Sequence, residues 1–118
     1  MKTAKTFSGI ALRCAADGVV REIITDSLGA ERCVEAGEPF ANLVDAASKA
    51  KAESFLATLR ERQAAFGWEM NVACRGGITP VHFAGAAAAV GGGAGADDFF
   101  FIVGAKSRDG VSRFYTDL

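Results

Sequence analysis

The sequence predicts an α+β domain in which helices pack on one face of an antiparallel sheet. Two apolar runs, 10–15 and 19–25, are joined through Asp17-Gly18 and indicate a β-hairpin. A long helical segment follows at 45–66, and after Gly67 apolar residues recur at every second position, as in a strand. Strands on both sides of a helical middle favour an α+β fold, and the absence of alternating βαβ units argues against a Rossmann or P-loop core.

The middle of the chain is expected to be helical. A short helical piece starts at Glu38-Pro39, and the long helix runs from about Asp45 to Phe66. Asp45 or Ser48 can cap its start, and Gly67 is expected to end it. One stripe at helical spacing would face the sheet: Ala52, Phe55, Leu56, Leu59 and Phe66.

Three more strands are expected after Gly67. Residues 68–74 alternate between larger apolar and other side chains, which predicts a half-buried strand. Residues 78–90 form the next strand by context, although the alanines from Ala84 to Ala89 favour a helix. The final strand, Phe99–Val103, is apolar throughout.

Composition and charge restrict the possible partners. The 118 residues include 13 basic and 14 acidic side chains, so the net charge of −1 offers no basic surface for nucleic acid or an anionic membrane. No apolar run is long enough to cross a membrane or to form the core of a signal peptide. The cysteines, Cys14, Cys33 and Cys74, form no CxxC pair and are expected to be reduced and buried. We therefore expect a soluble, cytoplasmic protein.

No catalytic or metal site is expected, and the protein is predicted not to be an enzyme. The single histidine, His82, has no acidic residue nearer in sequence than Glu69, so a strand histidine is expected rather than a catalytic or zinc-binding one. Residues 91–96 match G-x-G-x-x-A, but a strand follows instead of a helix, which indicates a hairpin loop. Asp97-Asp98 and the acidic residues of 35–38 are expected to be solvated.

The order of these elements resembles a PAS domain, a sensory module of bacterial signalling proteins. The resemblance covers residues 8 to about 105 and depends on order and spacing more than on any one motif. It is carried by Asp17-Gly18, Gly37-Glu38-Pro39-Phe40-Ala41-Asn42-Leu43-Val44, Phe55–Leu59, Trp68–Val72, Pro80–Gly85 and Ile102-Val103-Gly104.

The resemblance implies a five-stranded antiparallel sheet with helices across one face, often around a small cavity. Residues 1–105 would be the sensory domain and 106–118 the start of a signalling helix. A ligand or partner would then act through this helix on an effector beyond Leu118, such as a histidine kinase of a two-component system. Val111, Phe114, Tyr115 and Leu118 have helical spacing and end abruptly, so the chain is expected to be a piece of a longer protein. Dimerisation is expected through the N-terminal residues and this exit helix.

The resemblance does not extend to members that carry a chromophore. Flavin-adduct PAS domains have an Asn-Cys-Arg-Phe-like segment, which neither Arg32-Cys33-Val34 nor Cys74-Arg75 reproduces, and the long helix lacks the histidine of haem-binding members. No haem, flavin or other cofactor is therefore predicted, although a small ligand of unknown identity could still occupy the interior.

The residues predicted to lie between helix and sheet, and to line any ligand cavity, are Phe40, Leu43, Phe55, Leu59, Trp68, Met70, Phe83 and Phe101. The small side chains at 84–89 leave two interpretations open. Either they let the long helix approach closely, or they leave room for a ligand. A homodimerisation or interaction module with a filled core and no ligand is the alternative function.

Overall fold

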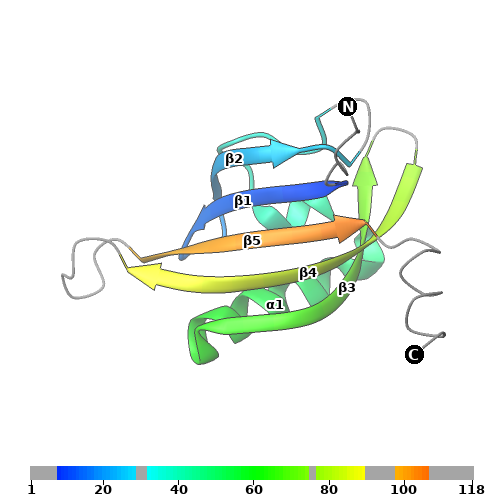
Figure 1. Ribbon diagram of the computed structural model, residues 1–118. Coiled ribbons are helices and arrows are strands. Elements are labelled where there is room, and N and C mark those ends of the chain that lie inside the picture. The colour runs from blue at the N-terminus through cyan, green and yellow to red at the C-terminus, as the bar shows by residue number, and fades with distance from the viewer. Residues whose placement is uncertain (1–7, 29–31, 75–76, 90–97, 107–118) are drawn as a thin grey trace, which may run out of the picture.

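The computed structural model describes residues 8–28, 32–74, 77–89 and 98–106, and it confirms the α+β class. Five strands form one antiparallel sheet in the order β2-β1-β5-β4-β3 (Figure 1). The strands are β1 (Gly9–Ala15), β2 (Val20–Asp26), β3 (Ala64–Cys74), β4 (Gly77–Ala89) and β5 (Asp98–Lys106). Between β2 and β3 lie the 3₁₀ helices η1 (Phe40–Leu43) and η2 (Ala46–Ser48) and the α-helix α1 (Lys49–Arg62).

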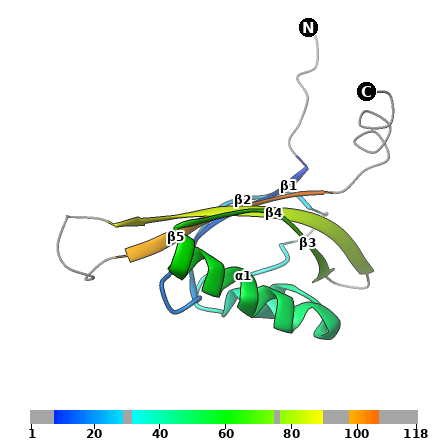
Figure 2. The ribbon, with the colours of Figure 1, turned by 90° about the horizontal axis from the view of Figure 1, so that it is seen from below.

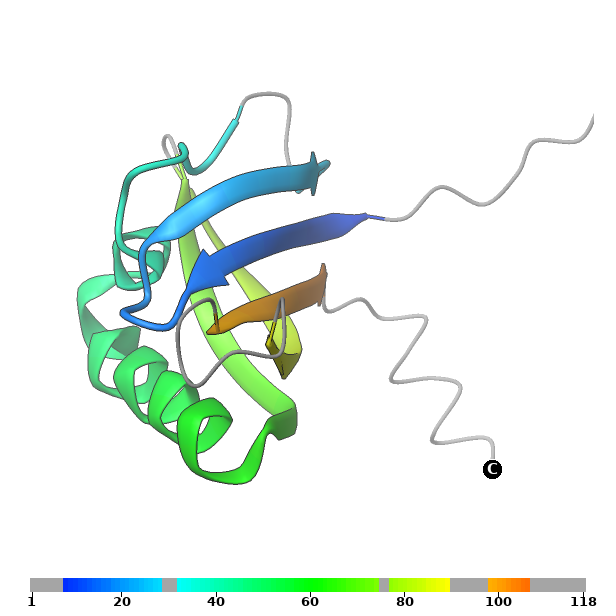
Figure 3. The same ribbon diagram turned by 90° about the vertical axis from the view of Figure 1, so that its left-hand side faces the viewer.

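All of the described helices lie on one face of the sheet. Figure 2 shows α1 beneath the sheet, and Figure 3 shows the segment between β2 and α1 on the same side. The buried face of α1 packs on the strands and consists of four residues at helical spacing: Ala52, Phe55, Leu56 and Leu59. Among the described residues, no helix is long and apolar enough to cross a membrane.

The helical middle is hydrogen-bonded to both outer strands of the sheet, β2 and β3. At β2, the Val20 amide donates to the Glu38 carbonyl oxygen, and Val19 forms an antiparallel bridge with Pro39. At β3, the Asp45 amide donates to the Asn71 carbonyl oxygen over 2.9 Å. These backbone bonds pair groups on the outer strands that would otherwise be unsatisfied, and they hold η1 and α1 over the sheet.

The long helix is shorter than predicted at both ends. It begins at Lys49, because Asp45 caps η2 by accepting from the Ser48 amide, while the Ser48 hydroxyl accepts from the Asn71 amide. It ends at Arg62, where Gln63 adopts φ of 71° and its amide donates to the Leu59 carbonyl oxygen.

The predictions that Gly67 ends the helix and that Phe66 belongs to its apolar stripe are therefore wrong. Both residues lie in β3, where the register shifts between Ala65 and Trp68, and Gly67 has a φ of 74°. Helical spacing alone could not show where the helix ends, because residues 64–65 belong to the sheet through their pairing with β4, which is distant in sequence.

The alanine run belongs to β4, as predicted, despite its propensity for helix. Every residue from Ala84 to Ala89 is paired with β5, from Ala84 with Val103 to Ala89 with Asp98. Gly85 and Ala86 are also paired with β3, and the Ala87 amide donates to the Gln63 carbonyl oxygen. These backbone hydrogen bonds outweigh the weak preference of alanine for helix. The glycine-rich motif at 91–96, Asp97, the N-terminal residues and the expected exit helix lie outside the described residues.

Candidate functional site

Seven of the eight residues predicted to line a ligand cavity meet between α1 and the sheet. They come from η1, α1, β3 and β4, and all are buried except Trp68, which is partly buried. They are Phe40, Leu43, Phe55, Leu59, Trp68, Met70 and Phe83. Their shared interior location is a property of the fold, and ligand binding there stays a prediction.

Four aromatic rings at the centre of this region contact one another. The centroid of Phe55 lies 5.9 Å from Phe40 and 5.6 Å from Trp68. The Phe83 ring lies edge-on to Phe40 with centroids 5.5 Å apart, and it is 6.2 Å from Phe55. These separations are typical of packed aromatic pairs, so each ring occupies space that a ligand would need.

Glycines under the core let these side chains approach the backbone. A Cβ at Gly104 would lie 2.6 Å from Cε1 of Phe83, and a Cβ at Gly85 would lie 3.2 Å from both δ-carbons of Leu59. Side chains therefore fill the places that a larger residue would take. This favours the interpretation in which small residues on β4 allow close approach of α1 over the one in which they leave a cavity.

Phe101 does not belong to this interior, and its assignment to the helix–sheet interface was wrong. It is 41% exposed, whereas its neighbour Phe100 is 2% exposed and packs in the core. Successive residues of a strand point to opposite faces, so only one of two adjacent phenylalanines can face α1. The apolar run Phe99–Val103 hid this, because it carries no polar residue to mark the outer face.

The face of the sheet away from α1 is called the open face below, and Figure 1 is seen from this side. Residues paired across neighbouring strands share a face, so the register identifies its members. On its central strands these are Ala11, Arg13 and Ala15 of β1, Phe99, Phe101, Val103 and Ala105 of β5, and His82, Ala84, Ala86 and Ala88 of β4. Phe99, Phe101 and Val103 of β5 therefore stand beside alanines of β4 on one side, and on the other side Phe101 is paired with Arg13 of β1.

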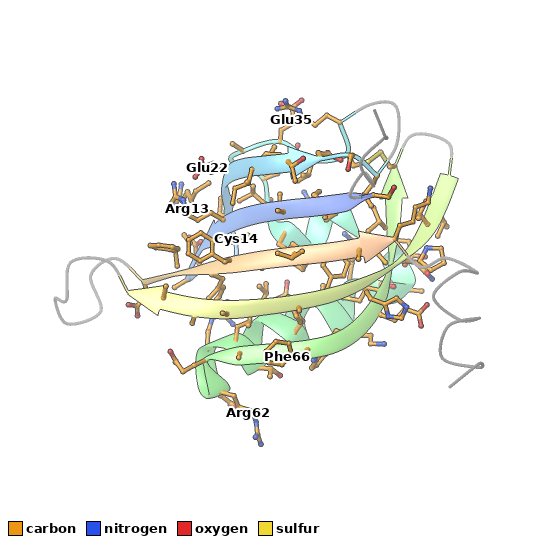
Figure 4. All side chains as sticks on the ribbon, in the orientation of Figure 1. Arg13, Cys14, Glu22, Glu35, Arg62 and Phe66 are labelled. Carbon is orange, nitrogen blue, oxygen red and sulfur yellow. A yellow bond between two sulfur atoms is a disulfide. The ribbon has the colours of Figure 1, made fainter. Side chains whose placement is uncertain are left out.

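Charged groups lie at the β1–β2 side of the open face. The Arg13 guanidinium bonds the Glu22 carboxylate at 3.1 Å and also lies 5.3 Å from the centre of the Phe99 ring. Figure 4 shows Arg13 and Glu22 projecting from neighbouring strands. Phe99 in turn packs edge-on against Phe101, with centroids 5.0 Å apart. This ion pair lies at the border of the apolar centre, and such exposed pairs contribute little to stability.

A hollow of about 270 Å³ lies where the end of α1 meets β4 and β5. The Arg60 side chain is held there, because its Nε donates to the Ala16 carbonyl oxygen over 2.9 Å and its guanidinium lies 6.0 Å from the Phe100 ring centre. The lining residues are Ala16, Arg60, Gln63, Ala87, Ala88, Asp98 and Phe100. These contacts make Arg60 part of the packing between α1 and the sheet.

The prediction of three reduced cysteines is wrong. Cys33, in the segment after β2, and Cys74, at the end of β3, form a disulfide with their Cα atoms 5.2 Å apart. Residues 41 apart in sequence meet here, which sequence spacing could not show. Disulfides are typical of oxidising compartments, so the argument for a cytoplasmic location from reduced thiols no longer holds.

Cys14 is free and buried on the α1 side of β1. Burial, with a smaller contribution from the Asp17 carboxylate, raises the pKa of the Cys14 thiol to about 12. The thiol is therefore protonated at neutral pH and acts as a small apolar core residue.

His82 is exposed on β4 and is paired in register with Glu69 of β3. Within residues 8–28, 32–74, 77–89 and 98–106, no group of three or more His, Cys, Asp or Glu side chains could hold a metal ion.

No protein-family model matches the sequence, and no curated protein matches it either. The resemblance to PAS domains therefore stays a prediction.

Proposed function

We propose that this chain is a non-enzymatic regulatory domain of PAS-like architecture that binds a protein partner through its open face. The observation that carries the proposal is the contrast between the two faces of β5. Phe100 and Ile102 are covered by the core, whereas Phe101 and Val103 on the open face are 41% and 45% exposed. A strand that is apolar on both faces is typical of strands covered on both faces, and α1 covers only one.

The filled interior supports partner binding over ligand sensing. The aromatic rings around Phe55 contact one another, and Leu59 and Phe83 lie against glycine backbone. A cavity of the size that holds a small molecule is about 300 Å³ or more, and these contacts occupy the region where one was predicted. The sensory role, in which a ligand acts through residues 106–118 on an effector, is the alternative.

Native mass spectrometry of the purified chain separates the two functions. We expect the bare mass of the chain, or a multiple of it, with no small molecule attached. An added mass of a few hundred daltons that is lost on denaturation would contradict the filled interior and favour a ligand sensor. An absorption spectrum of the same sample tests for haem or flavin directly.

A further inference from the structure

We infer that the partner of the open face is a second copy of this chain, and that large residues of β5 pack onto small residues of β4 across a two-fold axis. This inference rests on the proposed function, since it names the partner of the same face. An isologous interface uses one surface twice, so that surface must be complementary to itself. The register of the sheet provides this complementarity.

Three residues of β5 on the open face are each paired with an alanine of β4. Phe99 is opposite Ala88, Phe101 opposite Ala86, and Val103 opposite Ala84. Consider a two-fold axis that runs between β4 and β5, parallel to the strands and in the plane of the interface. This axis keeps positions along the strand and exchanges β5 with β4. Phe101 of one copy then faces the partner's Ala86, and Phe99 and Val103 face the partner's Ala88 and the partner's Ala84.

The same axis matches β1 with β3. Ala11 is paired with Val103, and Phe66 lies at the register shift of β3 beside Ala84, so both belong to one row across the sheet. Phe66 is 76% exposed and stands with Gly67 opposite Ala84 of the open face, because their neighbours Ala65 and Trp68 are paired with Gly85 and Phe83. It would therefore face the partner's Ala11, a further pairing of a large side chain with a small one.

The overlap of the two faces suits a weak dimer. At a rise of about 3.3 Å per residue, the nine residues of β5 span about 30 Å, and the four strands that overlap about this axis, β1, β5, β4 and β3, lie about 4.8 Å apart and span about 15 Å. The overlap therefore covers on the order of 450 Å² in plan, somewhat more than half of the roughly 800 Å² per partner of a standard interface. Packed sheets cross at about 30°, so the central pairing of Phe101 with Ala86 is the one most closely maintained.

The test is the dissociation constant of the full 118-residue chain, measured by sedimentation equilibrium from low to high micromolar concentration. We expect a dimer that Phe101→Ala weakens about tenfold or more, because a central apolar contact is lost. Ala86→Phe adds apolar area at an exposed position, yet it should weaken the dimer as well, since two phenylalanines then meet. The double variant F101A/A86F exchanges the large and small residues and should restore most of the affinity.

Ile78→Ala is the matched control, because Ile78 is an exposed apolar residue of β4 that lies beyond the segment paired with β5, which begins at Val81. It should leave the dissociation constant unchanged. The inference would be overturned if Phe101→Ala leaves the dissociation constant of the dimer unchanged, or if the double variant does not restore the affinity.

A chain that stays monomeric would overturn the inference too, and the melting temperature of Phe101→Glu then decides the proposed function. An unchanged melting temperature shows a free face, so the proposed function survives with a different partner. A fall well beyond that of Phe101→Ala, which loses the same packing against Phe99, shows that other residues of this chain cover the face, and both proposals fail.

Discussion

Leu59 of α1 lies directly on Gly85 of β4. A Cβ at position 85 would lie 3.2 Å from both δ-carbons of Leu59 and 3.0 Å from the carbonyl oxygen of Phe101. The distance between helix and sheet is therefore limited by a residue with no side chain.

Gly85→Ala should destabilise the fold, because the carbonyl of Phe101 belongs to the β5 backbone and cannot move aside cheaply. We expect a loss of about 1–3 kcal/mol in the free energy of unfolding, measured by urea denaturation. Gly77→Ala, in the same strand, is the control, since its Cβ would meet nothing closer than 4.0 Å. Equal effects of the two variants would show that α1 does not pack this closely on β4.

Two adjacent phenylalanines of β5 should respond very differently to truncation. Phe100→Ala removes a fully buried ring and should lower the free energy of unfolding by about 3–5 kcal/mol. Phe101→Ala should cost under about 1 kcal/mol when measured at concentrations where the chain is monomeric. Denaturation of both variants under identical conditions checks this, and the reverse order would mean that β5 faces the opposite way.

The Cys33–Cys74 disulfide should stabilise the fold. It closes a 41-residue separation that contains both 3₁₀ helices and α1. Restricting the unfolded chain in this way is typically worth about 2–4 kcal/mol. The variant C33S/C74S should therefore melt at a lower temperature than the oxidised protein and at a temperature similar to that of the reduced protein. If reduction leaves the melting temperature unchanged, the disulfide does not contribute.

The Cys14 thiol should resist alkylation in the folded protein. Burial raises its pKa to about 12 from an ordinary value of 9.0, so the reactive thiolate is scarce even at pH 9. We expect one thiol per chain to react with iodoacetamide in denaturant and none without it, counted by mass spectrometry of the oxidised protein. Rapid labelling of the native protein at pH 8 would contradict this burial.

The same shift in pKa gives a sign for the effect of alkaline pH. Well below pH 9 the thiol is protonated in both states, so Cys14 contributes no pH dependence there. Between pH 9 and about 12 the unfolded chain releases the proton and the folded chain does not, so the free energy of unfolding falls as pH rises. Cys14→Ala should be less sensitive over this range than the wild-type protein.

The sequence by itself determined the strands, the position of the helical middle and most of the core. Apolar residues recur at every second position after Gly67 and at helical spacing around Phe55, because one face of each element is buried. The spacing of apolar residues in the sequence therefore shows both the type of element and its buried face. Seven of the eight residues predicted for the helix–sheet contact lie in the interior for the same reason. The end of α1 was misplaced, because helical spacing continued formally to Phe66 while pairing with β4 began at Ala64.

Only the tertiary structure decided the rest. Phe99–Val103 is apolar on both faces, so no sequence pattern could tell that Phe100 faces α1 and Phe101 the open face. Cys33 and Cys74 meet although β2 and β3 are the two outermost strands of the sheet, and this contact joins residues 41 apart in sequence. The pairing of large β5 residues with β4 alanines is likewise a property of register. Local sequence specifies each element, but the contacts between elements exist only once the chain is folded.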